Sequence, residues 1–189
     1  IQVVIIPIPK ANGVITEVAE TIMAELKAKG ISVKYDNDKK NRPGFKFAEY
    51  EMKGVPVRVG IGKRDLEKGE VEIARRDTLE KQNVPLEGLA DYIENLLTDI
   101  QDNLLQRSKD YRTEHTTKVE SWEEFQSVLE EKGGFISAHW DGTTETELKI
   151  KEATKATIRC IPVNNELEDG KCVLTGKPSK QRVLFAKAY

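Results

Sequence analysis

The stretch Pro43–Arg76, PGFKFAEYEMKGVPVRVGIGKRDLEKGEVEIARR, sets basic residues, aromatic residues and two glycine-rich turns around one predicted strand. That strand is VPVRVGI at residues 55–61, a β-branched apolar run that contains a single charge. Residues 40–81 hold 11 Lys and Arg against 8 Asp and Glu, a local charge of +3, whereas the whole chain is −2, so the remaining residues sum to −5. A basic region inside an otherwise acidic chain favours a site for a polyanion.

Three aromatic residues lie among these basic ones. Phe45, Phe47 and Tyr50 offer rings on which unstacked bases can stack, as they do on many RNA-binding surfaces. Charge and rings alone are equally consistent with a solvated basic face whose aromatic residues lie in the core. Both interpretations stay open at this point.

The pattern of apolar residues predicts an α/β domain followed by a small α+β domain. In the first domain we expect strands at residues 1–8, 31–35, 55–61 and 69–75, a turn at residues 65–68, and helices at residues 14–29, 43–53 and 85–112, the last with Pro85 at its first position. In the second we expect a helix capped by Ser121, a helix at residues 145–153, strands at residues 135–139, 157–163 and 182–188, and an acidic loop at residues 164–171. Residues 113–118, between these two sets of elements, are polar and unpatterned.

Four segments resemble the C-terminal part of prolyl-tRNA synthetases of the archaeal and eukaryotic type, which are class II synthetases. They are PGFKFAEYEMKGVPVRVGIG, RDLEKGEVEIARRD, TIRCIP and LFAKAY, at residues 43–62, 64–77, 157–162 and 184–189. The segments keep the order they have in the family, and the similarity runs over nearly the whole chain. The resemblance implies a mixed-sheet class II anticodon-binding domain at residues 1–112, whose last helix is the connector, followed by the family's small α+β C-terminal domain at residues 113–189.

The resemblance also implies which residues recognise tRNA. The family's anticodon-reading positions correspond to Glu51, Arg58, Arg64 and Asp65. These residue types suit guanine, because a carboxylate accepts from N1–H and the N2 amino group while arginine donates to O6 and N7. Proline anticodons share two guanines, so two such sets are expected; the alternative is that Glu51 and Arg58 only pair with each other on the surface. The residues expected to hold the tRNA backbone through their charge are Arg75, Arg76 and Lys81.

Many members of the family hold zinc in the C-terminal domain between two short-spaced pairs of cysteines. The aligned positions in this chain are Asp141 and Thr146, then Cys172 and Thr175. Only one of the four is a thiol, and structural zinc takes a full set of four ligands. We therefore expect no bound metal and a site in which packing replaces it, with a makeshift site of His139, Asp141 and Cys172 as the alternative.

The sequence contains no recognisable catalytic motif. It has no P-loop, no GxSxG and no histidine cluster, and GIG at residues 60–62 does not continue into GxGxxG. His115 and His139 are isolated, so we expect ordinary surface or edge roles for them, and we expect Cys160 to be a buried apolar residue. The chain alone should be catalytically inactive and carry no cofactor. By resemblance, ATP and Mg²⁺ belong to the catalytic domain of the full-length ligase, which attaches proline to tRNA.

The resemblance implies three partners: tRNA(Pro), the missing catalytic domain of the same polypeptide, with Tyr189 as a candidate contact, and a second subunit in a homodimeric enzyme. With 33% charged and 38% hydrophobic residues, the composition is that of a soluble globular protein. No apolar run approaches the roughly 18 residues that span a membrane, and no secretion signal is present. Two cysteines without a CxxC pair fit a reduced, cytoplasmic setting. The absence of an initial Met before the strand-like IQVVIIPI favours a start at a domain boundary.

Two other readings remain. The chain can be an anticodon-binding domain of a sister synthetase for His, Thr or Gly, or a stand-alone tRNA-binding accessory protein with that fold. It can also be a flavodoxin-like enzyme acting on a small molecule, because the first domain is α/β. The terminal LFAKAY and the C-terminal domain count against the first, and the missing cofactor motifs count against the second.

Overall fold

The structure is a computed structural model that describes residues 1–8 and 13–188. Its internal contacts divide the chain into two compact units, Ile1–Arg107 and Ser108–Tyr189, which are treated separately below. Residues 9–12, which follow the first predicted strand, and the expected contact of Tyr189 lie outside the described residues.

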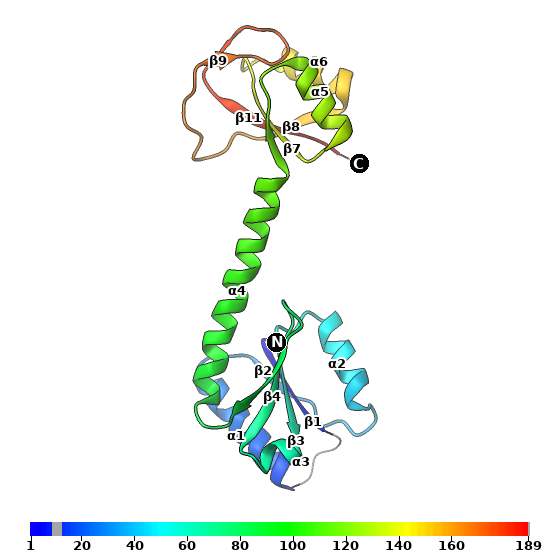
Figure 1. Ribbon diagram of the computed structural model, residues 1–189, viewed down its shortest axis with the longest axis vertical. Coiled ribbons are helices and arrows are strands. Elements are labelled where there is room, and N and C mark those ends of the chain that lie inside the picture. The colour runs from blue at the N-terminus through cyan, green and yellow to red at the C-terminus, as the bar shows by residue number, and fades with distance from the viewer. Residues whose placement is uncertain (9–12, 189) are drawn as a thin grey trace. The chain divides into compact units, whose positions relative to one another are not determined.

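A mixed sheet forms the centre of the first unit (Figure 1). Its described strands follow the order β2-β1-β3-β4-β5, in which β1 is parallel to β2 and β3, and the β3–β4 and β4–β5 pairs are antiparallel. This arrangement confirms the predicted mixed α/β class. The elements in chain order are β1 (Val3–Ile8), α1 (Gly13–Ala28), β2 (Val33–Tyr35), α2 (Pro43–Met52), β3 (Val57–Gly62), α3 (Lys63–Leu66), β4 (Glu70–Arg75), β5 (Lys81–Pro85) and α4 (Leu89–Glu114).

The two faces of this sheet are covered differently, because side chains alternate along each strand. Val57 and Val59 of β3 belong to the larger core, with buried residues of α1 and α4. Val4 of β1 packs on the opposite face with Tyr50 of α2. Figure 1 shows α2 on one side of the sheet and α1 and α4 on the other. Arg58, between Val57 and Val59, therefore belongs to the α2 face.

The sequence prediction was wrong where β5 and α4 meet. Residues 81–85 form strand β5, and α4 begins only at Leu89, so Pro85 ends an edge strand and does not open the helix. Edge strands tolerate proline and polar residues because one side of their backbone has no partner strand. The turn predicted at residues 65–68 overlaps the short helix α3. No helix in the described parts of the chain has both the length and the apolarity to cross a bilayer.

The second unit is built on another mixed sheet, with described strands in the order β6-β7-β11-β8. Phe125 of α5 and Phe185 of β11 are fully buried in its core and meet edge to face, with ring centroids 5.3 Å apart. Ser121 caps α5 as predicted, since its hydroxyl accepts from the Glu124 amide at 3.1 Å. The elements are β6 (Thr116–Lys118), α5 (Trp122–Glu131), β7 (Phe135–His139), α6 (Thr144–Thr154), β8 (Ala156–Cys160), β9 (Gly170–Lys171), β10 (Pro178–Ser179) and β11 (Arg182–Lys187).

Three expectations for the second unit were wrong. Residues 116–118, read as an unpatterned boundary, form edge strand β6, whose residues are too polar to show a period. Cys160 is exposed, because it ends edge strand β8 where the chain leaves the core. His139 is buried with 3% exposure, and its Nδ1 lies 3.1 Å from the Ser179 hydroxyl oxygen. It ends the interior strand β7, so it has no surface role.

A buried carboxylate joins the end of β4 to α4. The Asp77 side chain is 1% exposed, and its oxygens accept from Arg75 Nε at 2.8 Å, Arg75 Nη2 at 2.7 Å and Asn103 Nδ2 at 2.6 Å. The Arg75 hydrogen bonds hold the pKa of Asp77 well below its usual range, despite the opposing effect of burial. The interaction fixes the β4–β5 connection against α4.

We expect Asp77→Asn to lower the free energy of unfolding of the first unit by about 2–3 kcal/mol, because the partly buried Arg75 guanidinium loses the carboxylate that accepts from its Nε and Nη2. A carboxyl whose folded pKa is depressed stabilises the fold above its unfolded pKa of about 3.9, and this contribution is lost as the pH falls through the folded value. When the pH falls below about 4, the free energy of unfolding should therefore decrease less in the variant than in the wild type.

Urea unfolding at neutral and acidic pH, with amide exchange to separate the units, measures both effects. Asp99→Asn is the matched control, because Asp99 also pairs with Arg75 at 2.7 Å but has a side chain that is 63% exposed. Its cost should stay within about 0–1 kcal/mol. Equal costs for the two variants would contradict the assignment.

Candidate nucleic-acid interface

A small cleft opens on the α2 face of the first unit, between the C-terminal half of α2 and the sheet. It is formed because Gly54, with φ of +76°, ends the helix in a conformation that glycine adopts readily and turns the chain directly into β3. We name it the Arg58 cleft. Its free volume is about 20 Å³, close to that of a single water molecule, so a base can lie over it but not inside it. Its lining residues are Val4, Phe47, Tyr50, Glu51, Val55, Arg58, Ala74, Arg75 and Arg76.

Arg58 is the chemically unusual residue of the cleft. Its side chain is 6% exposed, and its guanidinium carbon lies 3.5 Å from the centre of the Phe47 ring, a close cation–π contact. Nη1 and Nη2 are buried and have no hydrogen-bond acceptor among the described residues. Glu72 Oε1 lies 3.4 Å from Nη2, near enough for attraction but without hydrogen-bond geometry.

Burial lowers the pKa of the Arg58 guanidinium, and the Glu72 and Glu51 carboxylates partly offset this effect. Arginine nevertheless stays charged at physiological pH. A buried cation with unfilled donors is costly, because each unmade hydrogen bond leaves a desolvated group. The cleft thus holds donors directed at an acceptor that the chain does not supply.

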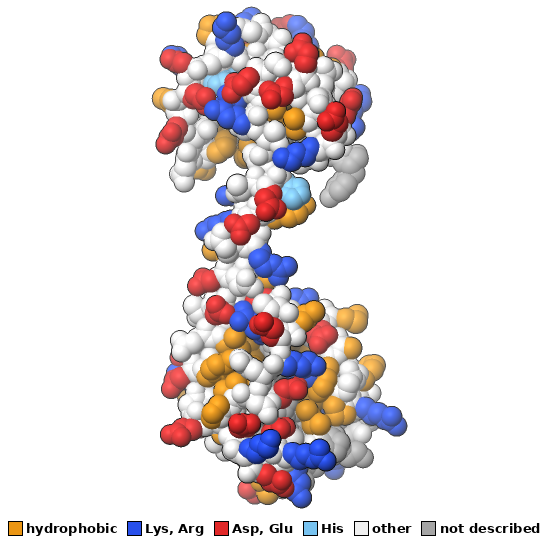
Figure 2. Space-filling model, viewed as in Figure 1, with side chains coloured by type: hydrophobic (Ala, Val, Ile, Leu, Met, Phe, Trp, Pro, Cys, Tyr) orange, Lys and Arg blue, Asp and Glu red, His pale blue; other side chains and the backbone are white. Residues whose placement is uncertain are grey.

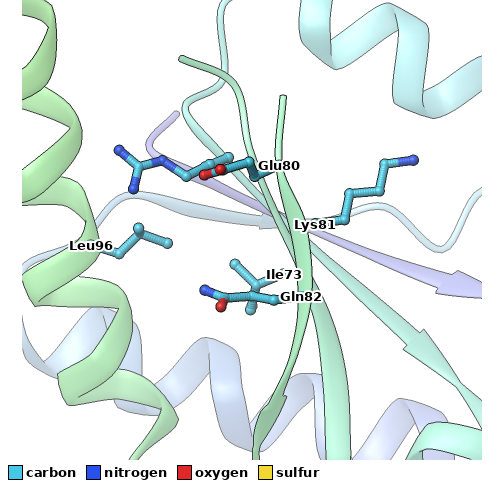
Figure 3. Close-up of a pocket in the computed structure, with 6 residues that line it drawn as sticks. Ile73, Glu80, Lys81, Gln82 and Leu96 are labelled. Atoms are coloured by element: carbon cyan, nitrogen blue, oxygen red, sulfur yellow. The ribbon is translucent and has the colours of Figure 1, made fainter. Parts of the chain in front are cut away.

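Arg58 also lies in a row that crosses the sheet. The strand register pairs it with Ala74 of β4, and Ala74 with Lys81 of β5. Exposure rises along the row from buried Arg58 through half-buried Ala74 to exposed Lys81. Figure 3 shows Lys81 projecting from β5 away from Gln82 and Leu96. Two strand spacings of about 4.8 Å separate Lys81 from Arg58, which puts a free cation within a nucleotide's reach of the cleft.

Glu51 and Arg76 form the rim of the cleft. Glu51 is exposed near the end of α2, and Arg76 Nε donates to its backbone carbonyl at 2.8 Å. This bond leaves the Glu51 carboxylate unused, so the alternative in which Glu51 merely pairs with Arg58 finds no support among the described contacts. Both predicted base-reading residues of the first set therefore meet at one place.

Arg64 and Asp65 form a separate group on α3, outside the Arg58 cleft. Arg64 is exposed and Asp65 is half-buried. Asp65 Oδ2 would lie only 2.7 Å from a Cβ at position 62, so Gly62 is needed for the carboxylate to approach the backbone. From Arg58 to Gly62 the strand extends roughly 13 Å at 3.3 Å per residue, which makes this a distinct second set.

Arg75 occupies a different environment from its neighbour Arg76. Its guanidinium is engaged by Asp77 and by Asp99 on α4, and these carboxylates raise its pKa. With Nε, Nη1 and Nη2 all donating to carboxylates, Arg75 has little capacity left for phosphate. The structure therefore counts against the predicted phosphate role of Arg75.

A larger pocket of about 360 Å³ lies between β4, β5 and α4 (Figure 3). Arg75 on its wall is already paired, and the Gln82 amide donates to the Tyr92 hydroxyl. Its polar groups are thus largely committed to the protein, and we assign it no ligand. Figure 2 shows acidic and basic side chains interspersed over the visible face of each unit.

Comparison with known protein families identifies this arrangement. The family model described as "Anticodon binding domain" matches residues 2–96. A second model, "Prolyl-tRNA synthetase, C-terminal", matches residues 122–189. The chain belongs to the prolyl-tRNA synthetase family.

Individual relatives agree with this assignment. The proline–tRNA ligase of Christiangramia forsetii is 57% identical over 192 residues, covering 100% of this chain and 39% of the relative. That of Porphyromonas gingivalis is 58% identical over 191 residues, covering 100% and 38%. The crystal structure of prolyl-tRNA synthetase from Cryptosporidium parvum, complexed with L-proline and AMP, matches with a TM-score of 0.92 and 30% identity over 100% of this chain and 41% of its own.

These matches confirm the resemblance inferred from the sequence. The chain spans about two fifths of the length of the prolyl-tRNA synthetases that it matches, 39% and 38% for the two ligases. Similarity over the whole chain, including the C-terminal domain, counts against a sister synthetase, and nothing found supports a flavodoxin-like enzyme.

In the second unit, three of the four positions that the resemblance matches to zinc-binding cysteines, Asp141, Thr146 and Thr175, meet at one carboxylate. Asp141 Oδ2 accepts from the hydroxyls of Thr146 at 2.8 Å and Thr175 at 2.9 Å. Its Oδ1 accepts from the amide and hydroxyl of Thr143 at 3.1 and 2.8 Å. Thr175 lies in the tight turn that Gly176 closes by donating to the Cys172 carbonyl at 2.9 Å. The carboxylate therefore links the start of α6 to this turn.

This set of side chains does not fit structural zinc. The carboxylate already accepts four hydrogen bonds, two of the aligned residues are neutral hydroxyls, and only Cys172 brings a thiol. Within the described residues, no group of three His, Cys, Asp or Glu side chains is placed to hold a metal, so the makeshift His139–Asp141–Cys172 site finds no support.

We expect Asp141→Asn to lower the free energy of unfolding of the second unit by roughly 1–3 kcal/mol, because an amide cannot accept from all four donors. Burial raises the pKa of Asp141, but the hydrogen bonds from Thr143, Thr146 and Thr175 outweigh it, and the net pKa is lowered. The carboxylate thus stabilises the fold above its unfolded pKa of about 3.9, and acidification through the folded value removes that stabilisation.

Tryptophan fluorescence isolates this unit, because both tryptophans of the chain, Trp122 and Trp140, lie in it. Asp169→Asn is the control, since its ion pair with Lys180 is exposed, with side chains 82% and 76% accessible. EDTA should leave the wild-type melting temperature unchanged, and metal analysis should find far less than one zinc per chain. This account would be overturned if EDTA lowered the melting temperature of the wild type and the Asp141→Asn substitution left the free energy of unfolding unchanged.

Proposed function

We propose that the chain is the tRNA-recognition part of a prolyl-tRNA synthetase and that it binds the anticodon of tRNA(Pro). The observation that carries this proposal is the Arg58 guanidinium, which is buried in the cleft with Nη1 and Nη2 free of hydrogen-bond acceptors. In an anticodon-binding domain, donors held in this way suit the acceptor edge of a base.

Guanine is the base that matches the chemistry of the cleft. It presents O6 and N7 as neighbouring acceptors, which a guanidinium contacts through two parallel N–H bonds, and N1–H and N2–H₂ as donors to a carboxylate. Arg58 and Glu51 supply these complementary groups at one site. Phe47 already covers one face of the guanidinium, so a base that makes two parallel N–H bonds has to approach in the plane of the guanidinium, along its Nη edge.

The remaining predicted residues complete a model of the interface. We assign Arg64 and Asp65 on α3 to the second guanine, because they repeat the combination of arginine and carboxylate. Exposed Arg76 and Lys81 hold backbone phosphates, and Arg75 serves mainly to fix β4 against α4. Phosphate contacts contribute affinity and base contacts contribute specificity.

We further propose the properties of the whole enzyme from its relatives' name, proline–tRNA ligase. Proline activation with ATP and Mg²⁺, and transfer to tRNA(Pro), belong to a catalytic domain outside these residues, so this chain alone is inactive and needs no cofactor. The polypeptide acts in the cytoplasm as a homodimer. Its tRNA-binding part comprises an anticodon-binding domain at residues 1–112 and a C-terminal domain at residues 113–189.

We expect Arg58→Ala to weaken binding of the cognate anticodon stem-loop by about 5- to 150-fold, the equivalent of one good bidentate base contact. The preference for guanine over a substituted base at one anticodon position should fall by a similar factor. Arg58→Lys keeps the charge and loses the planar fork, so it should lose most of the preference while retaining the salt dependence.

Arg76→Ala should instead weaken all stem-loops alike and reduce the dependence of log affinity on log salt concentration by about one unit. Arg159→Ala, which removes an exposed arginine from the second unit, is the charge-matched control. Fluorescence titrations at two salt concentrations give the affinities. Full guanine preference in Arg58→Ala would refute the assignment of this residue.

A further inference from the structure

A second buried cation lies on the same face of the sheet, and no role in binding has been assigned to it. Lys46 in α2 is 3% exposed. Its ammonium donates to the Asp36 carboxylate at 2.8 Å, the Asp36 carbonyl at 2.9 Å and the Asp38 carbonyl at 2.7 Å. Lysine has three donors, so all of them are satisfied.

The Asp36 carboxylate is held from two sides by α2. Its Oδ1 accepts from Lys46 and its Oδ2 accepts from the Tyr50 hydroxyl at 3.0 Å. Lys46 and Tyr50 are four residues apart and therefore lie on the same side of the helix. Asp36 itself follows β2, and its amide donates to the Ile5 carbonyl of β1 at 2.9 Å. The helix is thus fastened at two points to the rigid sheet.

These two points determine the rotation of α2 about its own axis. Phe47 and Glu51 each follow one of the anchoring residues by one position, which is about 100° around the helix. Among the α2 residues that line the cleft, Phe47 stacks on the Arg58 guanidinium and Glu51 lies at the rim. If the helix rotated, both would leave the base-binding geometry together.

Besides these two points, Arg76 Nε donates to the Glu51 carbonyl at 2.8 Å near the end of the helix, and the start of the helix is held less firmly. The helix is ten residues long, its N-cap residue Arg42 makes no side-chain capping bond, and no acidic residue lies in its first turn. A helix of this length is marginal without tertiary contacts. The apolar cluster under it contains only a few described residues, among them Tyr50, Val55 and the partly buried Phe47.

We propose that Lys46, Asp36 and Tyr50 are positioning residues that set the rotation of α2 and thereby the guanine discrimination of the Arg58 cleft. The proposal rests on the proposed function of that cleft. Lys46 and Asp36 lie outside the lining of the cleft and act through Phe47 and Glu51, whereas Tyr50 also lines the cleft, so the variant at Lys46 is the primary test. A guanidinium alone attracts any acceptor, whereas a guanidinium and a carboxylate at fixed separation select guanine.

Lys46→Met tests the proposal, because methionine has a similar length and fills the same space without the three donors. Cognate stem-loop binding should fall about 5-fold or more, and a stem-loop with a substituted guanine should bind as weakly as before, so the preference falls by that factor. General destabilisation would instead weaken every stem-loop equally. Amide exchange in α2 of the free protein should become faster in the variant.

Lys53→Met is the matched control, since Lys53 is the exposed C-cap residue of the same helix and its partner is Glu49. Its guanine preference should equal that of the wild type. If Lys46→Met does not fold, Tyr50→Phe keeps the ring and removes only one bond to Asp36, with an expected loss of about 2- to 5-fold. In an Arg58→Ala background, Lys46→Met should change the preference no further, because both act on the same contact.

The outcomes separate this proposal from the one it rests on. A wild type without guanine preference would refute the function proposed for the cleft. A wild type with full preference, together with a folded Lys46→Met or Tyr50→Phe variant that keeps it, would refute the positioning role alone. Equal losses in Lys46→Met and Lys53→Met would show a general effect of lysine charge and would also overturn it.

Discussion

The pairing of β1 with β3 is the constraint on which the first unit depends. The two strands run parallel in unbroken register from Val3 opposite Val57 to Ile8 opposite Gly62, and both are buried almost throughout. A buried parallel pair leaves each side chain only one of two directions. Odd-numbered residues of β3 enter the core with α1 and α4, so Arg58 has to share the other face with α2. The position of the Arg58 cleft follows from this alternation.

The same alternation explains why two adjacent arginines differ. The Arg75 side chain lies on the α4 side, where Asp77 and Asp99 bind it. Arg76 lies near the end of α2, where its Nε donates to the Glu51 backbone carbonyl. Adjacent positive charges look equivalent in a sequence, but a strand sends them to opposite faces. Arg75 fixes β4 against α4, and Arg76 remains exposed at the surface. Charge counts alone therefore overestimate the size of a binding surface.

The sequence predicted the structure correctly where an interaction joins neighbouring residues or where a segment has a strong apolar period. The order of the main helices and strands, the Ser121 cap and the family itself were all predicted correctly. Edge strands β5 and β6 escaped notice because their polar residues have no apolar period. The meeting of Arg58 with Phe47, and of Asp141 with Thr175, joins residues 11 and 34 positions apart. Only the folded chain decides such contacts, so the residue types were foreseen and their arrangement was not.

The unfilled donors of Arg58 place two demands on one residue. An apolar side chain of the same volume would remove the cost of a desolvated cation and make the RNA-free fold more stable, but it would leave nothing for a base to bind. If the cleft has the function proposed above, selection for guanine recognition and selection for a stable fold act in opposite directions at this position. A base bound over the cleft would then return part of the cost of the buried cation as additional stability of the bound state.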